Sequence, residues 1–285
     1  MNDGYRRSVP QKNSTFLVVV TYFPDDGFLI RLEKMAKLFC RVIVVDNGGT
    51  LSESVVQDNV SLIILEKNSG LAAGLNRGIR CALLRGAEWI VTLDQDSLLS
   101  ERFLASCAQA ISLRDHIFIL GANYCTPEGR KKFRGGDYGV GRAKTVITSG
   151  MLVHKTVFDK VGLMREEFFI DSIDHEFCLR ARRSGFYVYF NLEVAMTHSI
   201  GDYQSRTLFG TPIYKSSLRR YTISRNGVVT ILEYAGSDPM WALKRFAGLF
   251  LEFSVILVCE KNKLERIGLF FKGLMHGLMR NFDVS

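Results

Sequence analysis

The segment Asp94-Gln95-Asp96 carries two carboxylates separated by a single residue. Two carboxylates at this spacing can share a hard divalent cation, and the same cation can bind phosphate oxygens. A cation in that place neutralises the charge of a departing diphosphate. The same three residues also suit a solvated turn or a helix N-cap, because Asp-X-Asp is a common sequence. The motif alone leaves both interpretations open.

Asp46, in Val44-Val-Asp46-Asn-Gly, offers a second kind of chemistry. A carboxylate accepts a hydrogen bond from the imide N–H of uracil or thymine, and cytosine has no such group. Asp-Asn-Gly-Gly is also a turn cluster, so Asp46 can equally serve to stabilise a turn.

A third acidic group, formed by Asp171, Asp174 and Glu176, stands at the start of a helix predicted over residues 172–184. A carboxylate in the first helical turn is favoured in its ionised form by about 0.3–1 kcal/mol, and an ionised carboxylate can take a proton from an attacking hydroxyl. Asp174 is the preferred candidate for this base. Asp171 is the rival, although it also suits a helix cap, and Glu176 with Arg180 suits a helical ion pair.

The elements around these residues alternate between strands and helices in the first hundred residues. Strands are predicted at 16–21, 42–45, 62–65 and 89–93, and helices at 28–39 and 70–84. This order predicts an α/β fold with a parallel sheet covered by helices on both faces. Asp46-Asn47, Asn68-Ser69 and Asp94–Asp96 each follow a strand, so they should meet at the carboxyl edge of the sheet, where ligands bind.

The rest of the chain divides less regularly. Strands are predicted at 117–123, 146–149, 152–153 and 187–190, a mobile loop at 125–145, and helices at 243–258 and 264–279. We expect a disordered tail over residues 1–14 and a catalytic domain over 15–235, with a nucleotide-binding half at 15–100 and an acceptor-binding half at 101–235. Residues 236–285 are expected to form an amphipathic helical region.

Charge is concentrated near the carboxyl terminus. The net charge is +8, and residues 205–285 contribute +6 through 12 Lys/Arg against 6 Asp/Glu. This asymmetry indicates an anionic partner, and no nucleic-acid-binding motif accompanies it. The apolar helical segments are short for a bilayer span but suit attachment at a membrane surface. Packing on the catalytic domain or in a homo-oligomer is the alternative. Six cysteines without a CxxC pair favour buried thiols in a reducing, cytoplasmic compartment.

Taken together, these segments resemble family 2 glycosyltransferases of the GT-A fold over roughly residues 15–230. The resemblance rests on Val44–Gly48, Lys67–Gly78, Leu93–Ser97 and Phe168–Arg180, which stand in the family's order and spacing. It implies a GT-A-type, Rossmann-like, mainly parallel sheet with helices on both faces and a C-terminal helical segment. Leu93–Ser97, Met196–Asp202 and Arg225-Asn226 are similar to segments of bacterial dTDP-rhamnosyltransferases in particular.

The resemblance also implies roles for individual residues. Asp174 matches the base, and Mg²⁺ or Mn²⁺ would be held by Asp94, Asp96 and His198. Donor-binding positions are Thr21, Tyr22, Phe23, Asp46, Asn68, Asn76, Asp94, Gln95 and Arg225, and acceptor-binding positions are Ser149, Gly150 and Asp171. Simpler roles stay open for several of them. His198 can be structural, Ser149-Gly150 can be a plain link between strands, and Gly74 and Gly78 can serve only helix–sheet packing.

The function expected from this resemblance is an inverting transfer of L-rhamnose from dTDP-L-rhamnose. The expected acceptor is a lipid-linked saccharide of a bacterial surface polysaccharide such as O-antigen, at the inner face of the cytoplasmic membrane. Another donor, such as UDP-galactofuranose or UDP-glucose, is an alternative, as is an inactive binding module that has kept the fold. A nucleotidyltransferase is disfavoured because the region Phe16–Asp26 has no glycine-rich phosphate loop.

Overall fold

A computed structural model of the protein describes residues 7–125, 139–198, 203–206, 212–214 and 216–282. The chain forms two compact units, residues 1–166 with 177–199 and residues 167–176 with 200–285. The boundary therefore differs from the expected one at residue 235. Helix α6 (Leu218–Tyr234) groups with the C-terminal helices, and helix α5 (Ile173–Arg183) contributes its first turn to the second unit.

The first unit is built on a mixed sheet with the strand order β3-β2-β1-β4-β8-β6-β9-β5, and β7 pairs with β9. The bounds are β1 (Thr15–Thr21), β2 (Arg41–Asp46), β3 (Val60–Ile64), β4 (Trp89–Asp94), β5 (Ser97–Leu99), β6 (Ile117–Cys125), β7 (Val140–Ala143), β8 (Met151–His154) and β9 (Tyr187–His198). The pairs β1–β2, β1–β4 and β2–β3 are parallel, and β8 is antiparallel to both β4 and β6. The carboxyl ends of the first four strands thus lie at one edge, as the sequence predicted.

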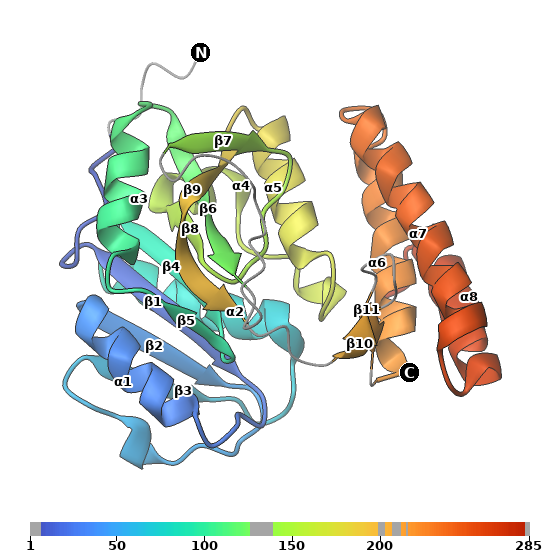
Figure 1. The fold of residues 1–285 in the computed structure, drawn as a ribbon, viewed down its shortest axis with the longest axis horizontal. Helices are drawn as coiled ribbons and strands as arrows, with labels where there is room; N and C mark the ends of the chain where they lie inside the picture. The colour runs from blue at the N-terminus through green and yellow to red at the C-terminus, as the bar shows by residue number, and fades with distance from the viewer. Residues whose placement is uncertain (1–6, 126–138, 199–202, 207–211, 215, 283–285) are drawn as a thin grey trace. The chain divides into compact units, whose positions relative to one another are not determined.

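Helices cover both faces of this sheet, as the alternation of β1 side chains requires (Figure 1). Leu17 and Val19 of β1 share a buried core with α1 (Phe28–Leu38) and α3 (Phe103–Ser112). Val18 and Val20 lie against α2 (Gly70–Leu84) on the opposite face. A short helix, α4 (Lys155–Val161), follows β8, and its Phe158 packs against Phe177. All six cysteines are free thiols.

Two sequence expectations were wrong. Residues 146–149 form no strand, and a turn at 149–150 leads into β8. The carbonyl of Thr148 accepts a hydrogen bond of 2.6 Å from the Thr92 hydroxyl. The described part of the N-terminal tail, residues 7–14, is packed against the first unit. Arg7 donates to the carbonyls of Ile111 and Asp115, and the Trp89 indole donates to the carbonyl of Ser8. Of the loop expected at 125–145, residues 140–143 form β7, and residues 126–138 lie outside the described residues, as do 1–6.

The described part of the second unit contains the segment 167–176, a small hairpin and the C-terminal helices, of which the hairpin and the helices are orange and red in Figure 1. Its elements are β10 (Tyr203–Arg206), β11 (Pro212–Tyr214), α6, α7 (Pro239–Cys259) and α8 (Lys263–Leu278). Ile223, Leu249, Ile256 and Phe270 form a core that joins the helices. None of the described helices combines the length and the hydropathy needed to cross a bilayer.

A buried ion cluster reinforces this second core. Arg220 of α6 is completely buried and donates hydrogen bonds to Glu252 of α7 and to Glu260 just after it. Arg266 of α8 lies 3.1 Å from Glu260. Burial by itself lowers the pKa of Arg220, but the hydrogen bonds and charges of Glu260 and Glu252 outweigh it and raise the pKa. One guanidinium thus links α6 to Glu252 of α7 and to Glu260, which follows that helix.

The contact of α2 with β1 makes a testable prediction. A Cβ atom at Gly78 would lie 2.3 Å from Val18 Cγ1 and 3.2 Å from Val45 Cγ2. We expect Gly78→Ala to lower the free energy of unfolding by about 1–3 kcal/mol, because neither valine can move within the sheet. Gly268→Ala in α8 is the matched control, since open space surrounds that position, and it should leave stability unchanged or raise it by up to about 1 kcal/mol. Equal denaturation midpoints for the two variants would contradict the close packing.

Candidate active site

The pairing of β5 with β9 brings together three side chains that could hold a metal ion. Asp94 ends β4, Asp96 immediately precedes β5, and Ser97 of β5 pairs with His198 of β9. One ligand atom from each of Asp94, Asp96 and His198 lies within 4.8 Å of the other two. Two carboxylates and an imidazole suit a divalent cation, and a three-ligand set leaves positions for phosphate oxygens. The structure therefore assembles the set that the sequence predicted, although residues 94 and 198 are far apart in the chain.

Two buried serines form hydrogen bonds to members of this cluster. The hydroxyl of Ser97 lies 2.6 Å from His198 Nδ1 and 2.8 Å from the hydroxyl of Ser149. The Asp94 backbone N–H donates to Ser149 Oγ at 3.2 Å. Such contacts orient metal ligands. Ser149 was expected to bind the acceptor; the structure places its fully buried side chain against Asp94 and Ser97, and an acceptor contact stays a prediction.

Gly150 has a packing role beside the same residues. Its φ of +74° is in the left-handed region, and a Cβ atom would lie 2.7 Å from Ala122 Cβ and 2.8 Å from Met196 Sδ. Only glycine fits there. The expected contact of Gly150 with the acceptor stays a prediction.

Two exposed aromatic rings follow β1 at the same edge of the sheet. The side chains of Tyr22 and Phe23 are 49% and 62% exposed, and their rings meet edge to face with centroids 4.7 Å apart. Gln95 holds this segment: its Oε1 accepts from the Tyr22 N–H at 2.7 Å, and its Nε2 donates to the Tyr22 carbonyl at 3.1 Å. Phe23 has a φ of +46°. Strain of this kind gathers at binding sites, and exposed rings can stack on a nucleobase.

Asp46 is in a different environment. Its carboxylate is completely buried and accepts hydrogen bonds from the Thr21 hydroxyl and from the backbone N–H groups of Gly48, Thr50 and Leu51. This geometry matches the turn-stabilising alternative. A contact between Asp46 and a base requires one of these donors to leave, so that role stays a prediction, as does a ligand contact by the buried Thr21 side chain.

The two asparagines expected to bind the donor stabilise local structure. Asn68 Oδ1 accepts from Asn47 Nδ2 at 2.9 Å and from the Gly70 N–H at 3.0 Å, which orders the entry into α2. Asn76 is buried and exchanges hydrogen bonds of 2.8 Å with the backbone of Met164. A donor contact by either residue remains untested.

The acidic block lies in the second unit, where its two aspartates differ in their surroundings. Asp171 Oδ1 is 2.5 Å from Arg219 Nη2, and its Oδ2 accepts from the Thr222 hydroxyl at 2.6 Å. Asp174 is 19% exposed and its Oδ1 accepts from the His175 N–H at 2.8 Å. Asp174 is thus the more accessible of the two carboxylates. Arg225, expected to bind the donor diphosphate, is completely buried and donates to backbone carbonyls.

Sequence reasoning missed one residue beside the Asp-X-Asp segment. Arg31 of α1 donates from its Nε to the Gln95 carbonyl at 3.0 Å and forms an ion pair with Asp25 at 2.8 Å. The available signal was a basic residue within a helix of otherwise regular apolar spacing. Residues 199–202, which complete the His198 segment, lie outside the described residues.

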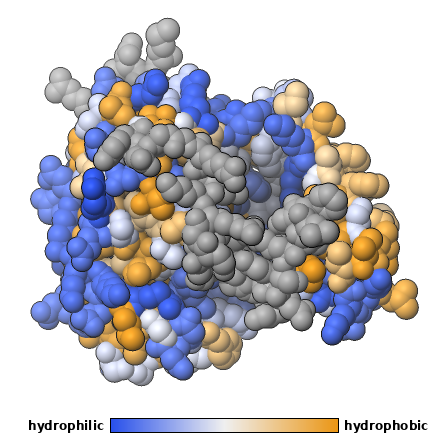
Figure 2. Space-filling model, viewed as in Figure 1, coloured by the Kyte–Doolittle hydropathy of each residue, from blue (hydrophilic) through white to orange (hydrophobic). Residues whose placement is uncertain are grey.

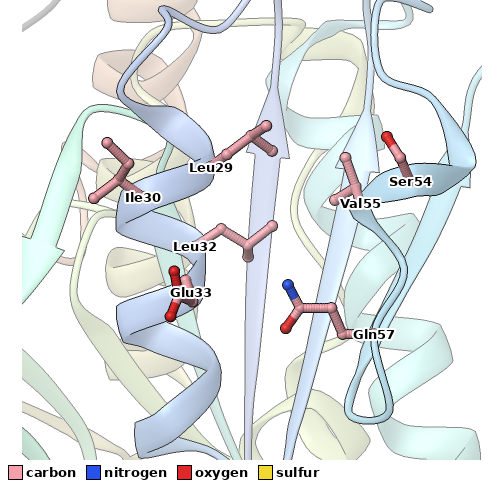
Figure 3. A pocket seen from close by; sticks show the side chains of 7 residues that line it. All are labelled: Leu29, Ile30, Leu32, Glu33, Ser54, Val55 and Gln57. Atoms are coloured by element: carbon pink, nitrogen blue, oxygen red, sulfur yellow. The ribbon is translucent and has the colours of Figure 1, made fainter.

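A shallow cavity of about 200 Å³ lies elsewhere in the first unit, between α1 and the segment 54–57 (Figure 3). Its lining residues are Leu29, Ile30, Leu32, Glu33, Ser54, Val55 and Gln57. Glu33 is the sole charged group of that lining and is negative, so the cavity does not suit a diphosphate. None of the predicted site residues lines it.

Comparison with known proteins identifies the family. The model of Glycosyl transferase family 2 matches residues 17–187. This chain belongs to that family. It is 30% identical over 280 residues to the dTDP-rhamnosyl transferase RfbF of Shigella flexneri, covering 89% of this chain and 91% of the relative. The protein is therefore a glycosyltransferase.

Solved structures share its fold. TarS 1-349 of S. aureus superposes with a TM-score of 0.61 at 16% identity, covering 95% of this chain and 88% of that one. A structure of GalNAc-T7 with UDP, GalNAc and Mn²⁺ gives a TM-score of 0.53 at 12% identity, covering 66% of this chain and 44% of that one. The expected GT-A fold is confirmed.

The metal cluster of this glycosyltransferase can be tested by calorimetry. We expect Mn²⁺ or Mg²⁺ to bind the wild-type protein in the presence of dTDP. Asp96→Asn should weaken this binding by about 10- to 100-fold or more, because mutating a residue that only hydrogen-bonds to a metal ligand already has an effect of that size. Asp58→Asn, a change at an exposed aspartate of the same unit, should bind like the wild type. Unchanged affinity in Asp96→Asn would remove Asp96 from the metal site.

Proposed function

We propose that this family 2 glycosyltransferase transfers L-rhamnose from dTDP-L-rhamnose to the hydroxyl of a lipid-linked saccharide, with inversion at the anomeric carbon. The observation that carries the proposal is the Asp94–Asp96–His198 cluster, which lies on the edge where β1 and β4 end. The choice of sugar is supported by the dTDP-rhamnosyl transferase relative, which matches most of this chain.

The donor is held by its diphosphate and its base. A Mg²⁺ or Mn²⁺ ion at Asp94, Asp96 and His198 would offset the charge of the dTDP leaving group. The exposed rings of Tyr22 and Phe23 stack on the base, a contact worth roughly 1–3 kcal/mol per base in other proteins. Gln95 fixes the backbone beneath these rings. As the second part of this proposal, Asp46 recognises the nucleobase. One backbone N–H of the loop 47–51 leaves the Asp46 carboxylate, and the imide N–H of the nucleobase donates to it instead.

Asp174 serves as the catalytic base, which takes the proton of the acceptor hydroxyl. As the acceptor oxygen forms its bond to the anomeric carbon, the bond from that carbon to the diphosphate breaks, and the hydroxyl proton passes to the Asp174 carboxylate. Asp171 is already engaged by Arg219 and Thr222, which disfavours it for this step. The intact acidic residues favour an enzyme over an inactive binding module.

Donor choice and base assignment can be tested together in the full chain. dTDP and UDP should raise the melting temperature more than CDP or GDP, and dTDP-L-rhamnose should release dTDP in the presence of synthetic alkyl glycosides.

Asp174→Asn should lower kcat by roughly 10²–10⁴-fold, because an amide takes no proton, while dTDP affinity stays within about twofold. Asp159→Asn, at an exposed aspartate of α4, is the control. Full activity of Asp174→Asn with an inactive Asp171→Asn would transfer the role to Asp171.

We also propose that α7 and α8 attach the protein to the inner face of the cytoplasmic membrane. Figure 2 shows hydrophobic side chains gathered on these helices. Exposed apolar residues recur at helical intervals: Leu243, Phe246, Phe250 and Leu257 in α7, and Leu264, Phe271, Met275 and Leu278 in α8. Lys244, Lys261 and Lys263 are exposed on the same unit, whereas Glu252 and Glu260 are withdrawn into the ion cluster. Apolar helices with a basic surface suit anionic lipid.

Vesicle sedimentation tests the attachment. The protein should sediment with vesicles containing anionic phosphatidylglycerol at low salt, and less with purely zwitterionic vesicles or at high salt. Phe246→Ser with Phe250→Ser should abolish sedimentation. Leu84→Ser, which removes an even more exposed apolar side chain, in α2, should not. If the wild type ignores anionic vesicles but dimerises through these helices, the face is a contact between two copies.

A further inference from the structure

The loop that leads into α5 is held in an unfavourable backbone conformation. Phe169, Asp171 and Ser172 have φ values of +62°, +67° and +60°, although none of them is glycine. A left-handed conformation is costly for residues with a side chain. Contacts from outside the loop must therefore offset this cost, and the candidate base Asp174 follows only two residues later.

Those contacts come from two buried residues of α6. Asn226 Nδ2 lies 2.9, 2.8 and 2.9 Å from the carbonyl oxygens of Phe168, Ile170 and Asp171. Arg225 Nη2 donates to the carbonyls of Glu167 and Phe168 at 3.0 and 3.3 Å. Together the two side chains contact the carbonyls of four loop residues, Glu167, Phe168, Ile170 and Asp171. The carbonyls of these four residues therefore face the two side chains, whose N–H groups donate to them.

The two α6 residues also hold each other. Arg225 Nε donates to Asn226 Oδ1 at 3.0 Å, which fixes the amide so that its nitrogen faces the loop. Both side chains are completely buried. Within the described residues, the guanidinium contacts backbone carbonyls, this amide and the rings of Tyr221 and Phe282. A buried cation bound mainly to carbonyls is unusual. The position of this guanidinium therefore depends on the backbone of the loop, whose carbonyls accept its hydrogen bonds.

We propose that Arg225 and Asn226 are positioning residues for Asp174: they hold the loop 167–172 in the conformation from which α5 starts and thereby fix the Asp174 carboxylate for proton transfer. This inference rests on the proposed role of Asp174 as the base. It replaces a diphosphate contact of Arg225 with an action through the backbone. The Arg225-Asn226 pair then contributes to kcat and not to donor affinity.

The test compares Asn226→Ala with Thr230→Val in the full chain. Thr230 is a matched control because it is buried in the same helix and its hydroxyl donates only within that helix, to the Asn226 carbonyl at 2.6 Å. With dTDP-L-rhamnose and an alkyl glycoside acceptor, Asn226→Ala should lower kcat on the order of 10²-fold, as small displacements of reacting groups do. Its donor KM and dTDP affinity should stay within about twofold, and Thr230→Val should keep the wild-type kcat. Arg225→Lys, which keeps the cation but loses the planar fork, should lose kcat in the same way.

A double variant distinguishes positioning from general loss of structure. If Asn226 acts through Asp174, then Asn226→Ala should change kcat by less than about threefold in the Asp174→Asn background, because the group it positions is gone. A full additional loss there, or a raised donor KM in Arg225→Lys, overturns the inference. A nearly normal Asp174→Asn enzyme instead refutes the proposed base, and that result is read from the single variant alone.

Discussion

The parallel pairing of β1 with β2 and β4 is the constraint on which the first unit of this glycosyltransferase and its candidate site depend. It aligns Thr21 with Asp46 and places Val20 beside Asp94, so the residues that follow three strands emerge at one edge. The pairing is possible because β1 is apolar on both faces and α2 approaches it closely at Gly74 and Gly78. A larger residue in α2 would separate the helix from the sheet that aligns the site.

At the other end of the sheet, one short strand completes the metal cluster. β5 has three residues, yet its antiparallel pairing sets Ser97 opposite His198 and so brings Asp96 to the imidazole. The serines behind it show why polar residues are buried there: Ser97 and Ser149 link Asp94 to His198 through three hydrogen bonds. Two residues expected to touch substrate, Ser149 and Gln95, form hydrogen bonds to the backbone of neighbouring candidate site residues, Asp94 and Tyr22.

In the second unit, the burial of two acidic side chains determines the charge of the exposed surface. Arg220 and Arg266 neutralise Glu252 and Glu260 inside the helical core. Burial raises the pKa of Glu252, and Arg220 opposes that rise. Because these two acids are withdrawn, the exposed charge near α7 is dominated by lysines. Arg225 and Asn226 of the same helix hold the acidic loop, so α6 contacts both the helices α7 and α8 and the loop before Asp174.

The sequence by itself determined the local elements and the chemistry available. The β-branched runs and helical spacing predicted the first four strands and the bounds of α2 at residues 70 and 84, because each depends on neighbours within a few residues. The Asp-X-Asp pair and His198 were also recognisable by type and context. Only the tertiary structure shows which polar residues are engaged within the protein. Asp46 and Asn76 have residue types that suit both binding and turn stabilisation, and the structure shows both buried and hydrogen-bonded to the backbone. The pairing of β5 with β9 joins residues about a hundred positions apart, and the position of Arg225 depends on a loop in another part of the chain. Contacts at such distances leave no local pattern, since they arise from the packing of whole elements.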